Sequence, residues 1–377
     1  MLSCDVIAVY NNAHMTPSDY SDNLEQTQET TQRPHHVPEA EFESVFAAGQ
    51  QLAQQLHEVP DGDLVGDMVL TALKLLRDNN NRGDLKLVSK SFKELRYALK
   101  VFSPYREVRK VSIFGSARTP ESHTDYRQAS DFAKQMAGLG WMVITGAGGG
   151  IMAAGHGGAG PEPSFGLGIR LPFEQNPNPF IANDKKLINF KYFFTRKLMF
   201  VRAAHAVALF PGGFGTMDEG FEVLTLVQTG KSIPMPIVLV DSPGGAYWKK
   251  WNEYIHDVLL EHHLINEEDL SLYMVTERVA DAVAEITHFY SNYHSIRYYR
   301  DDLIIRLAYR PTAEQLHQLN RDFADIQVTG TMSASGPLPV ESDEPDLNHL
   351  HRVVFHFNKR SQGRLRLLIN RLNEMTP

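Results

Sequence analysis

The fold class that the sequence predicts for residues 106–290 is α/β, with a doubly wound parallel sheet covered by helices on both faces. Two observations lead to this prediction. Short and almost entirely apolar stretches alternate with amphipathic stretches of helical period, as strands buried on both faces alternate with crossover helices. Three of the apolar stretches also run directly into glycines, which is typical of strand ends that face a ligand.

The elements of this domain follow in order along the chain. Runs of apolar, β-branched and aromatic residues predict strands at 110–117, 141–150, 164–171, 206–210 and 236–241. Apolar residues spaced by three and four predict helices at 126–140, 151–160, 188–204, 216–230 and 246–264. This alternation predicts a Rossmann-like core.

Different patterns flank this core. Residues 1–38 are polar with little periodicity and are expected to form a loose arm. Residues 39–105 carry apolar residues at helical spacing and predict a helical N-terminal unit. Residues 291–377 predict a small α+β C-terminal unit. Its expected elements are strands at 302–309, 325–333 and 351–358, helices at 312–323 and 362–375, and a polar loop at 334–346.

Composition and charge exclude several classes of protein. The 377 residues are 42% hydrophobic, as in an ordinary soluble globular protein, and the net charge of −8 argues against non-specific nucleic-acid binding. The single cysteine, Cys4, rules out an intrachain disulfide framework. The chain contains no apolar run of membrane-spanning length, and its first residues lack a basic signal-peptide start. We therefore expect a cytoplasmic protein that binds neither nucleic acid nor membrane.

Three glycine-bearing turns follow strands of the predicted sheet, at 114–118 ("FGSAR"), 145–155 ("TGAGGGIMAAG") and 211–216 ("PGGFGT"). Glycine lets the backbone approach an anion closely, and the first N–H groups of a following helix bind phosphate. Three such turns in one sheet predict a ligand that carries phosphate, with Gly115 and Ser116 of the first turn among its contacts. Neither the acid of a dinucleotide site nor a P-loop accompanies them.

Charged residues near the third turn indicate chemistry beyond phosphate capture. Asp218 and Glu219 directly follow "PGGFGT". They could be ordinary partners of the helix dipole, but a helix N-terminus that already holds phosphate gains nothing from two further negative charges. Upstream, six basic residues in a stretch without acids form either a solvated face or a face toward an anion, and we favour the second. They are Lys185, Lys186, Lys191, Arg196, Lys197 and Arg202.

The paired motif "RK" at 196–197 and P-G-G-x-G-T-x-x-E at 211–219 resembles the signature of the Lonely Guy family, whose members were long mislabelled as lysine decarboxylases. "GAGGGIMAAG" and "FGSAR" are similar to two further turns of that family. The resemblance covers about residues 106–290, and the flanking units suggest one of the longer bacterial branches. It implies a phosphoribohydrolase, which cleaves the N-glycosidic bond of a nucleoside 5′-monophosphate to give a free base and ribose 5-phosphate.

Carried over by position, the resemblance implies that Arg196 and Glu219 are the catalytic pair. The residues that would cradle the 5′-phosphate are Gly212, Gly213, Gly215 and Thr216, with Gly148, Gly149 and Gly150 nearby. The residues expected to line the nucleotide site are Lys197, Asp218 and Thr225. The family usually has Glu where Asp218 stands, so the contact made by Asp218 departs from its pattern. Glu174, in "LPFEQNPNPF", is a further candidate for binding ribose hydroxyls.

This chemistry gives a reason for acids after the glycines. Cleavage of a glycosidic bond develops positive charge on the ribose, and a carboxylate can stabilise that charge or activate water. Arg196 could hydrogen-bond the substrate or hold Glu219 ionised. The base would be a purine or a cytokinin-type base, and the sequence does not distinguish them.

Two other functions remain open at this point. Proteins of the same fold carry nucleotides or a molybdenum cofactor without hydrolysing them. A decarboxylase would need a pyridoxal lysine with a supporting acid, and neither Lys197 nor Lys231 has that context. For the hydrolase we expect a nucleoside monophosphate as the substrate, no cofactor, no metal and a homodimer or larger homo-oligomer.

Overall fold

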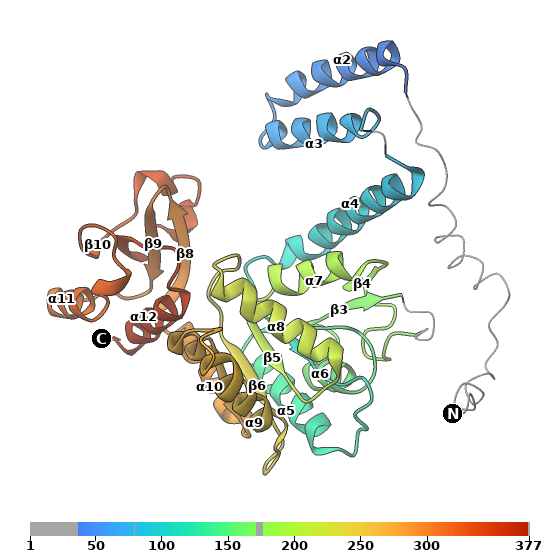
Figure 1. The fold of residues 1–377 in the computed structure, drawn as a ribbon. Helices are drawn as coiled ribbons and strands as arrows, with labels where there is room; N and C mark the ends of the chain where they lie inside the picture. The colour runs from blue at the N-terminus through green and yellow to red at the C-terminus, as the bar shows by residue number, and fades with distance from the viewer. Residues whose placement is uncertain (1–36, 79, 171–175, 376–377) are drawn as a thin grey trace, which may run out of the picture. The chain divides into compact units, whose positions relative to one another are not determined.

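The structure is a computed structural model that describes residues 37–78, 80–170 and 176–375 (Figure 1). It divides into two compact units, with the boundary between Glu94 and Leu95. The expected division of the chain at residues 38, 105 and 290 stays a prediction. Most of the expected loose arm lies outside the described residues.

Helices form the described part of the first unit. They are α2 (Glu39–Leu56), α3 (Gly62–Lys74) and α4 (Arg82–Phe102), and the last of these continues into the second unit. Glycines allow α2 and α3 to approach closely: a Cβ at Gly49 would lie 2.3 Å from Leu73 Cδ1, and one at Gly66 would lie 3.1 Å from Ala53 Cβ. A side chain at Gly49 would therefore displace the Leu73 side chain.

The second unit contains a seven-stranded sheet in the order β4-β3-β2-β1-β5-β6-β7, with every pair parallel. Its strands are β1 (Lys110–Phe114), β2 (Met142–Thr145), β3 (Ser164–Ile169), β4 (Leu187–Phe190), β5 (Ala206–Leu209), β6 (Ile237–Val240) and β7 (Tyr273–Thr276). Its helices are α5 (Thr124–Gly138), α6 (Ile151–Ala159), α7 (Phe193–Arg202), α8 (Phe214–Gln228), α9 (Tyr247–Tyr254) and α10 (Val279–Phe289). The predicted α/β fold class is confirmed.

Side chains alternate between two cores on the faces of this sheet. Val111 and Ile113 of β1 pack with α5, α6 and α10, whereas Phe114 packs with α7, α8 and α9 on the other face. Chain order reverses at β1, because β2, β3 and β4 follow on one side and β5, β6 and β7 on the other. Ligands bind at such a switch point, beyond the carboxyl ends of the strands. Here those ends belong to β1 and β5, which lead into the first and third glycine turns.

Two predictions for this sheet need correction. Residues 188–190 were expected to be helical but form part of the edge strand β4, where Ile188 pairs with Leu167 and Phe190 with Ile169. Both side chains are buried, so sheet pairing overrides helical spacing. The long helix expected at 246–264 is α9 followed by a π-helical segment, Ile255–Leu260. Sequence analysis also missed β7, α10 and a 3₁₀ helix, η4 (Glu267–Leu272).

The C-terminal region forms a separate antiparallel sheet in the order β10-β11-β9-β8, as expected for a small α+β unit. Its elements are β8 (Tyr293–Tyr299), β9 (Asp302–Leu307), α11 (Ala313–Asp322), β10 (Ser333–Ser335), β11 (His351–His356) and α12 (Gln362–Glu374). Strand β8 was not predicted. Of the strand expected at 325–333, Ser333 belongs to β10 and Gln327 forms an isolated antiparallel bridge with Phe357, whereas the other residues are not strand. At Met332 the side chains of Asn320 and Gln327 bind the backbone in place of a strand neighbour.

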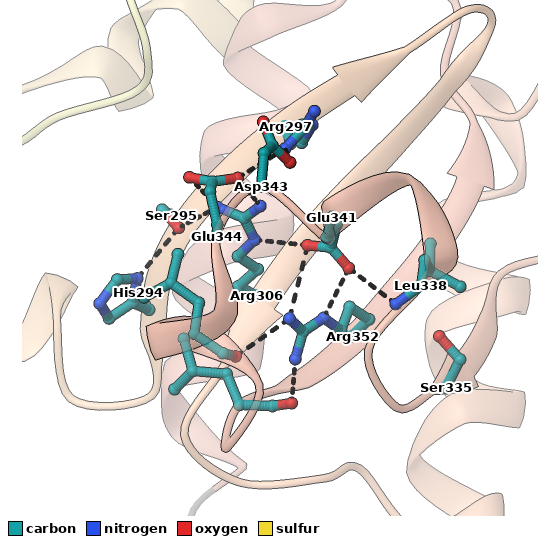
Figure 2. A network of polar contacts seen from close by, with 12 residues as sticks. His294, Ser295, Arg297, Arg306, Ser335, Leu338, Glu341, Asp343, Glu344 and Arg352 are labelled. Carbon is teal, nitrogen blue, oxygen red and sulfur yellow. Dashed lines mark hydrogen bonds and ion pairs between the residues drawn. The ribbon is translucent and has the colours of Figure 1, made fainter. Parts of the chain in front are cut away.

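A buried ion-pair network joins this sheet to the loop between β10 and β11 (Figure 2). Glu341 accepts hydrogen bonds from Arg306 Nε at 2.7 Å, Arg352 Nε at 2.9 Å and the Leu338 amide at 3.0 Å. Glu344 pairs with Arg306 as well. The polar loop is therefore fixed to β9 and β11, and Glu341, Arg306 and Arg352 are almost wholly removed from water.

Helix α12 connects the C-terminal sheet to the larger one. Asn373 accepts hydrogen bonds from the Asn292 and Tyr293 amides and donates to Phe289 O at the end of α10. At the other end of α12, Gly363 lies against Glu268 of η4. Within the described part of the chain, every helix is too short or too polar to cross a membrane.

Candidate functional site

The glycine turns after β1, β2 and β5 meet at the switch point of the sheet. The Ser116 amide donates to Pro211 O at 3.1 Å, and Ser116 O accepts from the Ile151 amide at 3.0 Å. Gly150 has φ of +58°, and a Cβ there would lie 2.2 Å from Ser116 O. Glycine is therefore required at 150 both for the backbone conformation and for contact between the turns.

A cavity of about 860 Å³ opens over these turns. Nine of the residues predicted from the sequence line it: Gly115, Ser116, Arg196, Gly212, Gly213, Gly215, Thr216, Asp218 and Glu219. The second turn contributes Gly146 to the lining, whereas Gly148, Gly149 and Gly150 are not among the lining residues. Glu174 lies outside the described residues.

The third turn presents its backbone to the cavity. A Cβ at Gly213 or Gly215 would meet no atom within 4 Å, so these positions border open space. In the described part of the chain, no acceptor is bonded to the amides of Gly213, Phe214 or Gly215. Helix α8 begins at Phe214 without a side-chain cap. Free N–H groups at a helix N-terminus suit an anion.

Glu219 lies on the first turns of α8, with its side chain 9% exposed. Its Oε2 is buried and accepts no hydrogen bond from the described residues, and Lys197 Nζ lies 3.6 Å away. Burial raises the pKa of Glu219 to about 7, against the lowering effect of Lys197 and Arg196. The site therefore holds a carboxyl group that can exchange a proton near neutral pH.

Arg196 is held on the opposite wall by backbone carbonyl groups. Its Nε donates to Leu167 O at 2.7 Å and its Nη2 donates to Gly146 O at 3.2 Å. The guanidinium also lies 5.2 Å from the centre of the Phe200 ring. A Cβ at Gly146 would lie 2.4 Å from Arg196 Nη2, so glycine at 146 makes room for the guanidinium. These contacts fix the positive charge of Arg196 at the cavity wall.

Lys197 lines a second hollow, which shares Asp218 with the main cavity. Its Nζ lies 2.6 Å from Glu222 Oε2 and 2.9 Å from Asp218 Oδ2. Burial works to lower the pKa of Lys197, but hydrogen bonds to Glu222 and Asp218 outweigh it and raise the pKa. Thr225 lines this hollow together with Lys197 and Asp218 and does not line the main cavity. Lys197 therefore lies within ion-pair distance of three carboxylates, those of Asp218, Glu219 and Glu222.

A buried polar network supports the second glycine turn. His156, fully buried, contacts Phe165 O through Nε2 at 3.0 Å. A carbonyl accepts only, so the proton lies on Nε2, and Nδ1 accepts from Asn178 Nδ2 at 3.1 Å. Asn178 Nδ2 also donates to Gly148 O, and the Asn178 amide donates to Ala147 O. Ala147 has φ of +66°, which these hydrogen bonds hold in place.

Asn178→Ala is expected to lower the free energy of unfolding by about 1–3 kcal/mol, because it leaves His156 Nδ1 buried without its donor and removes the hydrogen bond to the half-buried Gly148 O. Urea unfolding measures this. The matched control is Asn176→Ala, two residues earlier and exposed, which should change stability little. Equal stability of the two variants would show that the network does not support the turn.

Sequence analysis missed several residues that line the cavity, among them Gly146, Met152, Phe193, Phe214 and Tyr247. Gly146 lies within the second glycine turn at 145–155, although the sequence analysis did not single it out. Phe214, whose side chain is 96% exposed, was detectable as an apolar residue between glycines that a core would not use. Nothing in the local sequence marks Tyr247, because it reaches the site only through the fold of α9.

Comparison with known proteins agrees with the motif analysis. Residues 150–286 match the family model described as "Possible lysine decarboxylase", which confirms the predicted family resemblance over this segment. None of the curated proteins matches the chain.

Several solved structures are similar to about half of the chain. A molybdenum cofactor carrier protein from Chlamydomonas reinhardtii is 20% identical, with 48% of this chain and 97% of that chain covered and a TM-score of 0.35. A molybdenum cofactor binding protein from Rippkaea orientalis is 18% identical, with 48% and 94% covered and a TM-score of 0.34. DNA processing protein A from Helicobacter pylori is 11% identical, with 49% and 81% covered and a TM-score of 0.31. Similarity at this level says nothing about what the present chain binds.

Proposed function

We propose, from the family match of residues 150–286 and the geometry of the cavity, that the protein hydrolyses the N-glycosidic bond of nucleoside 5′-monophosphates. The observation that carries the proposal is the buried carboxyl of Glu219, which lies less than one helical turn beyond Thr216 of the glycine turn. A phosphate bound by the turn would bring the attached ribose within reach of this carboxyl. The substrate base is a purine or a cytokinin-type base.

Each part of the cavity has a role in this reaction. The amides of Gly213, Phe214 and Gly215 bind the 5′-phosphate. The ionised Glu219 stabilises the positive charge that develops on the ribose and accepts a proton from the attacking water. The water oxygen bonds to C1′ as the bond from C1′ to the base nitrogen breaks. The proton that Glu219 took from the water then passes, directly or through solvent, to the departing base nitrogen, which leaves Glu219 ionised again. The products are the free base and ribose 5-phosphate.

Arg196 acts beside the carboxylate. Because its guanidinium is held by Leu167 O and Gly146 O, it can meet an anionic or hydroxyl group of the substrate without moving. Its charge also opposes the effect of burial on Glu219 and so increases the ionised fraction near neutral pH. Arg196 therefore both binds substrate and tunes the carboxyl.

The proposal is tested by incubating the purified protein with adenosine, guanosine, inosine, cytidine, uridine and isopentenyladenosine monophosphates and following base release by chromatography. We expect release from a subset, with one ribose 5-phosphate formed per base. The corresponding nucleosides serve as matched substrates and should react much more slowly, since they lack the phosphate. No release from any monophosphate, together with tight nucleotide binding by calorimetry, would replace the hydrolase with a non-catalytic nucleotide carrier.

A further inference from the structure

The first residue of α9, Tyr247, reaches the third glycine turn from outside the sequence motifs. Its hydroxyl donates a hydrogen bond to Gly212 O, and its side chain lines the cavity with Gly212, Gly213 and Thr216. Burial raises the pKa of the Tyr247 phenol, so the proton needed for this hydrogen bond stays in place through the neutral range. Tyr247 is thus a permanent donor to the backbone of the turn.

This hydrogen bond fixes the orientation of the Gly213 N–H as well as that of the Gly212 carbonyl group. The C=O of Gly212 and the N–H of Gly213 belong to the same planar trans peptide and point in opposite directions. When Gly212 O is held by Tyr247, the Gly213 N–H must point away from Tyr247. That N–H is the first of the three amides without an acceptor in the described part of the chain.

Little else holds this peptide in one orientation. Glycine stands on both sides of it, and two adjacent glycines permit a peptide flip that side chains would hinder. Gly212 itself is confined, because a Cβ there would lie 2.1 Å from Thr216 Oγ1 and 2.9 Å from the Ser116 nitrogen. Gly213 borders open space, where a Cβ would meet nothing within 4 Å. Gly213 O accepts hydrogen bonds from the Thr216 and Met217 amides, which fix the following peptide and leave the Gly212–Gly213 peptide itself to be held through Gly212 O.

Tyr247 is in turn held firmly at the start of α9. The carboxylate of Asp241, which is 4% exposed, accepts hydrogen bonds from the Trp248 amide at 2.9 Å and the Ser242 amide at 3.1 Å. The Tyr247 and Trp248 rings meet edge to face, with centres 4.8 Å apart. Asp241 thereby anchors the first turn of α9 and places the Tyr247 hydroxyl at Gly212 O.

We propose that Tyr247 is a positioning residue that determines specificity for the 5′-phosphate, because its hydroxyl locks the Gly212–Gly213 peptide with the Gly213 N–H available to an anion. The inference rests on the proposed function, in which the turn at 211–216 binds the phosphate. The inference separates the chemistry on the ribose from the binding of the phosphate. Glu219 and Arg196 act on the ribose, whereas Tyr247 affects only substrates that carry phosphate.

The test compares Tyr247→Phe with Tyr254→Phe, a matched control at the last residue of α9 whose side chain is 48% exposed. Removing one hydrogen bond that orients a phosphate donor should weaken binding of ribose 5-phosphate roughly three- to tenfold, measured by calorimetry. The same factor should appear in kcat/KM for the monophosphate, through KM. The slow reaction of the corresponding nucleoside should keep its kcat/KM, and Tyr254→Phe should change none of these values.

Two results would overturn the inference. One is ribose 5-phosphate binding by Tyr247→Phe that equals that of Tyr254→Phe. The other is an equal loss of activity on nucleotide and nucleoside, which would mean that Tyr247 merely supports the fold. If the wild type releases no base from any substrate, the hydrolase proposal fails, and the ribose 5-phosphate titration alone still decides the role of Tyr247. A wild type that binds neither ribose 5-phosphate nor inorganic phosphate would contradict both.

Discussion

Glu219→Gln is expected to abolish base release and, above pH 7, to make the protein more stable than the wild type. The loss of activity should be roughly 10²- to 10⁴-fold, the usual contribution of a positioned acid–base group. The carboxamide has the same shape as the carboxyl group but cannot accept a proton from water or carry the negative charge that stabilises the ribose. The substitution thus removes the chemistry and leaves the cavity intact.

The gain in stability follows from burial of the Glu219 carboxyl. Its pKa is about 7 in the folded protein, against 4.5 as the ordinary value. A raised pKa means that the folded state binds the proton more tightly, so stability is full below pH 4.5 and is lost as the pH rises to 7. Glutamine avoids this loss, which at pH 8 amounts to at most about 3 kcal/mol. At pH 4 the variant and the wild type should unfold alike.

Thermal unfolding at pH 4 and pH 8, with base release assayed at each pH where the protein is folded, measures both effects. Glu253→Gln, at an exposed position of α9, is the matched control and should alter neither. In the wild type, activity should rise with pH up to about 7, because the carboxyl must be ionised to act. A variant that keeps its activity would remove Glu219 from the mechanism. A variant less stable than the wild type at pH 8 would show that the pKa is not raised.

The sequence predicted most of the sheet because its signals are local. An apolar run such as "AVALF" is buried on both faces whichever strand lies beside it, so β5 could be recognised without knowing its neighbours. The edge strand β4 was mistaken for the start of a helix, because its burial depends on pairing with β3. The short strand β10 depends in the same way on its pairing with β11 and on the Asn320 side chain, which accepts a hydrogen bond from the amide of Met332 directly before the strand. Elements that tertiary contacts define cannot be read from periodicity.

The residues of the candidate site likewise include some that the sequence could predict and some that only the fold reveals. Residues within the motifs, such as Ser116, Arg196 and Glu219, were predicted because their spacing and type follow from the chemistry, and the fold brings them to one cavity. Tyr247 could not be predicted, since its contact with Gly212 requires the placement of α9. The difference between the two hollows, with Lys197 and Thr225 in one and Arg196 in the other, also appears only in three dimensions.

Glu341→Gln is expected to destabilise the four-stranded C-terminal sheet by about 3–5 kcal/mol. Glu341 is 1% exposed and holds Arg306 and Arg352, which are 3% and 0% exposed, through its two oxygens. Glutamine fills the same space and can still accept one of these hydrogen bonds. Its neutral amide, however, leaves two guanidinium groups buried without their shared counter-charge, which is the costly way to break a buried pair.

Urea unfolding measures the loss of stability. Hydrogen exchange of the β9 and β11 amides then shows whether the loss lies within the C-terminal sheet. Asp343→Asn is the matched control from the same loop, because its side chain is 64% exposed and forms a surface ion pair with Arg297, so little change is expected. A Glu341→Gln variant as stable as Asp343→Asn would show that the buried ion-pair network does not add to the free energy of unfolding.

The two carboxyl groups, both removed from solvent, should respond to pH in opposite ways because their donors differ. Burial works to raise the pKa of each, but in Glu341 the hydrogen bonds from Arg352, the Leu338 amide and Arg306 outweigh burial and lower the pKa. Glu341 therefore contributes stability above pH 4.5 that is lost in acid as the pH falls through its lowered pKa, so the cost of Glu341→Gln should shrink there. For Glu219 the buried Oε2 lacks a donor in the described part of the chain, and the difference from glutamine grows toward alkaline pH instead. A carboxyl group surrounded by donors holds a fold together, whereas one left without a donor is available for catalysis.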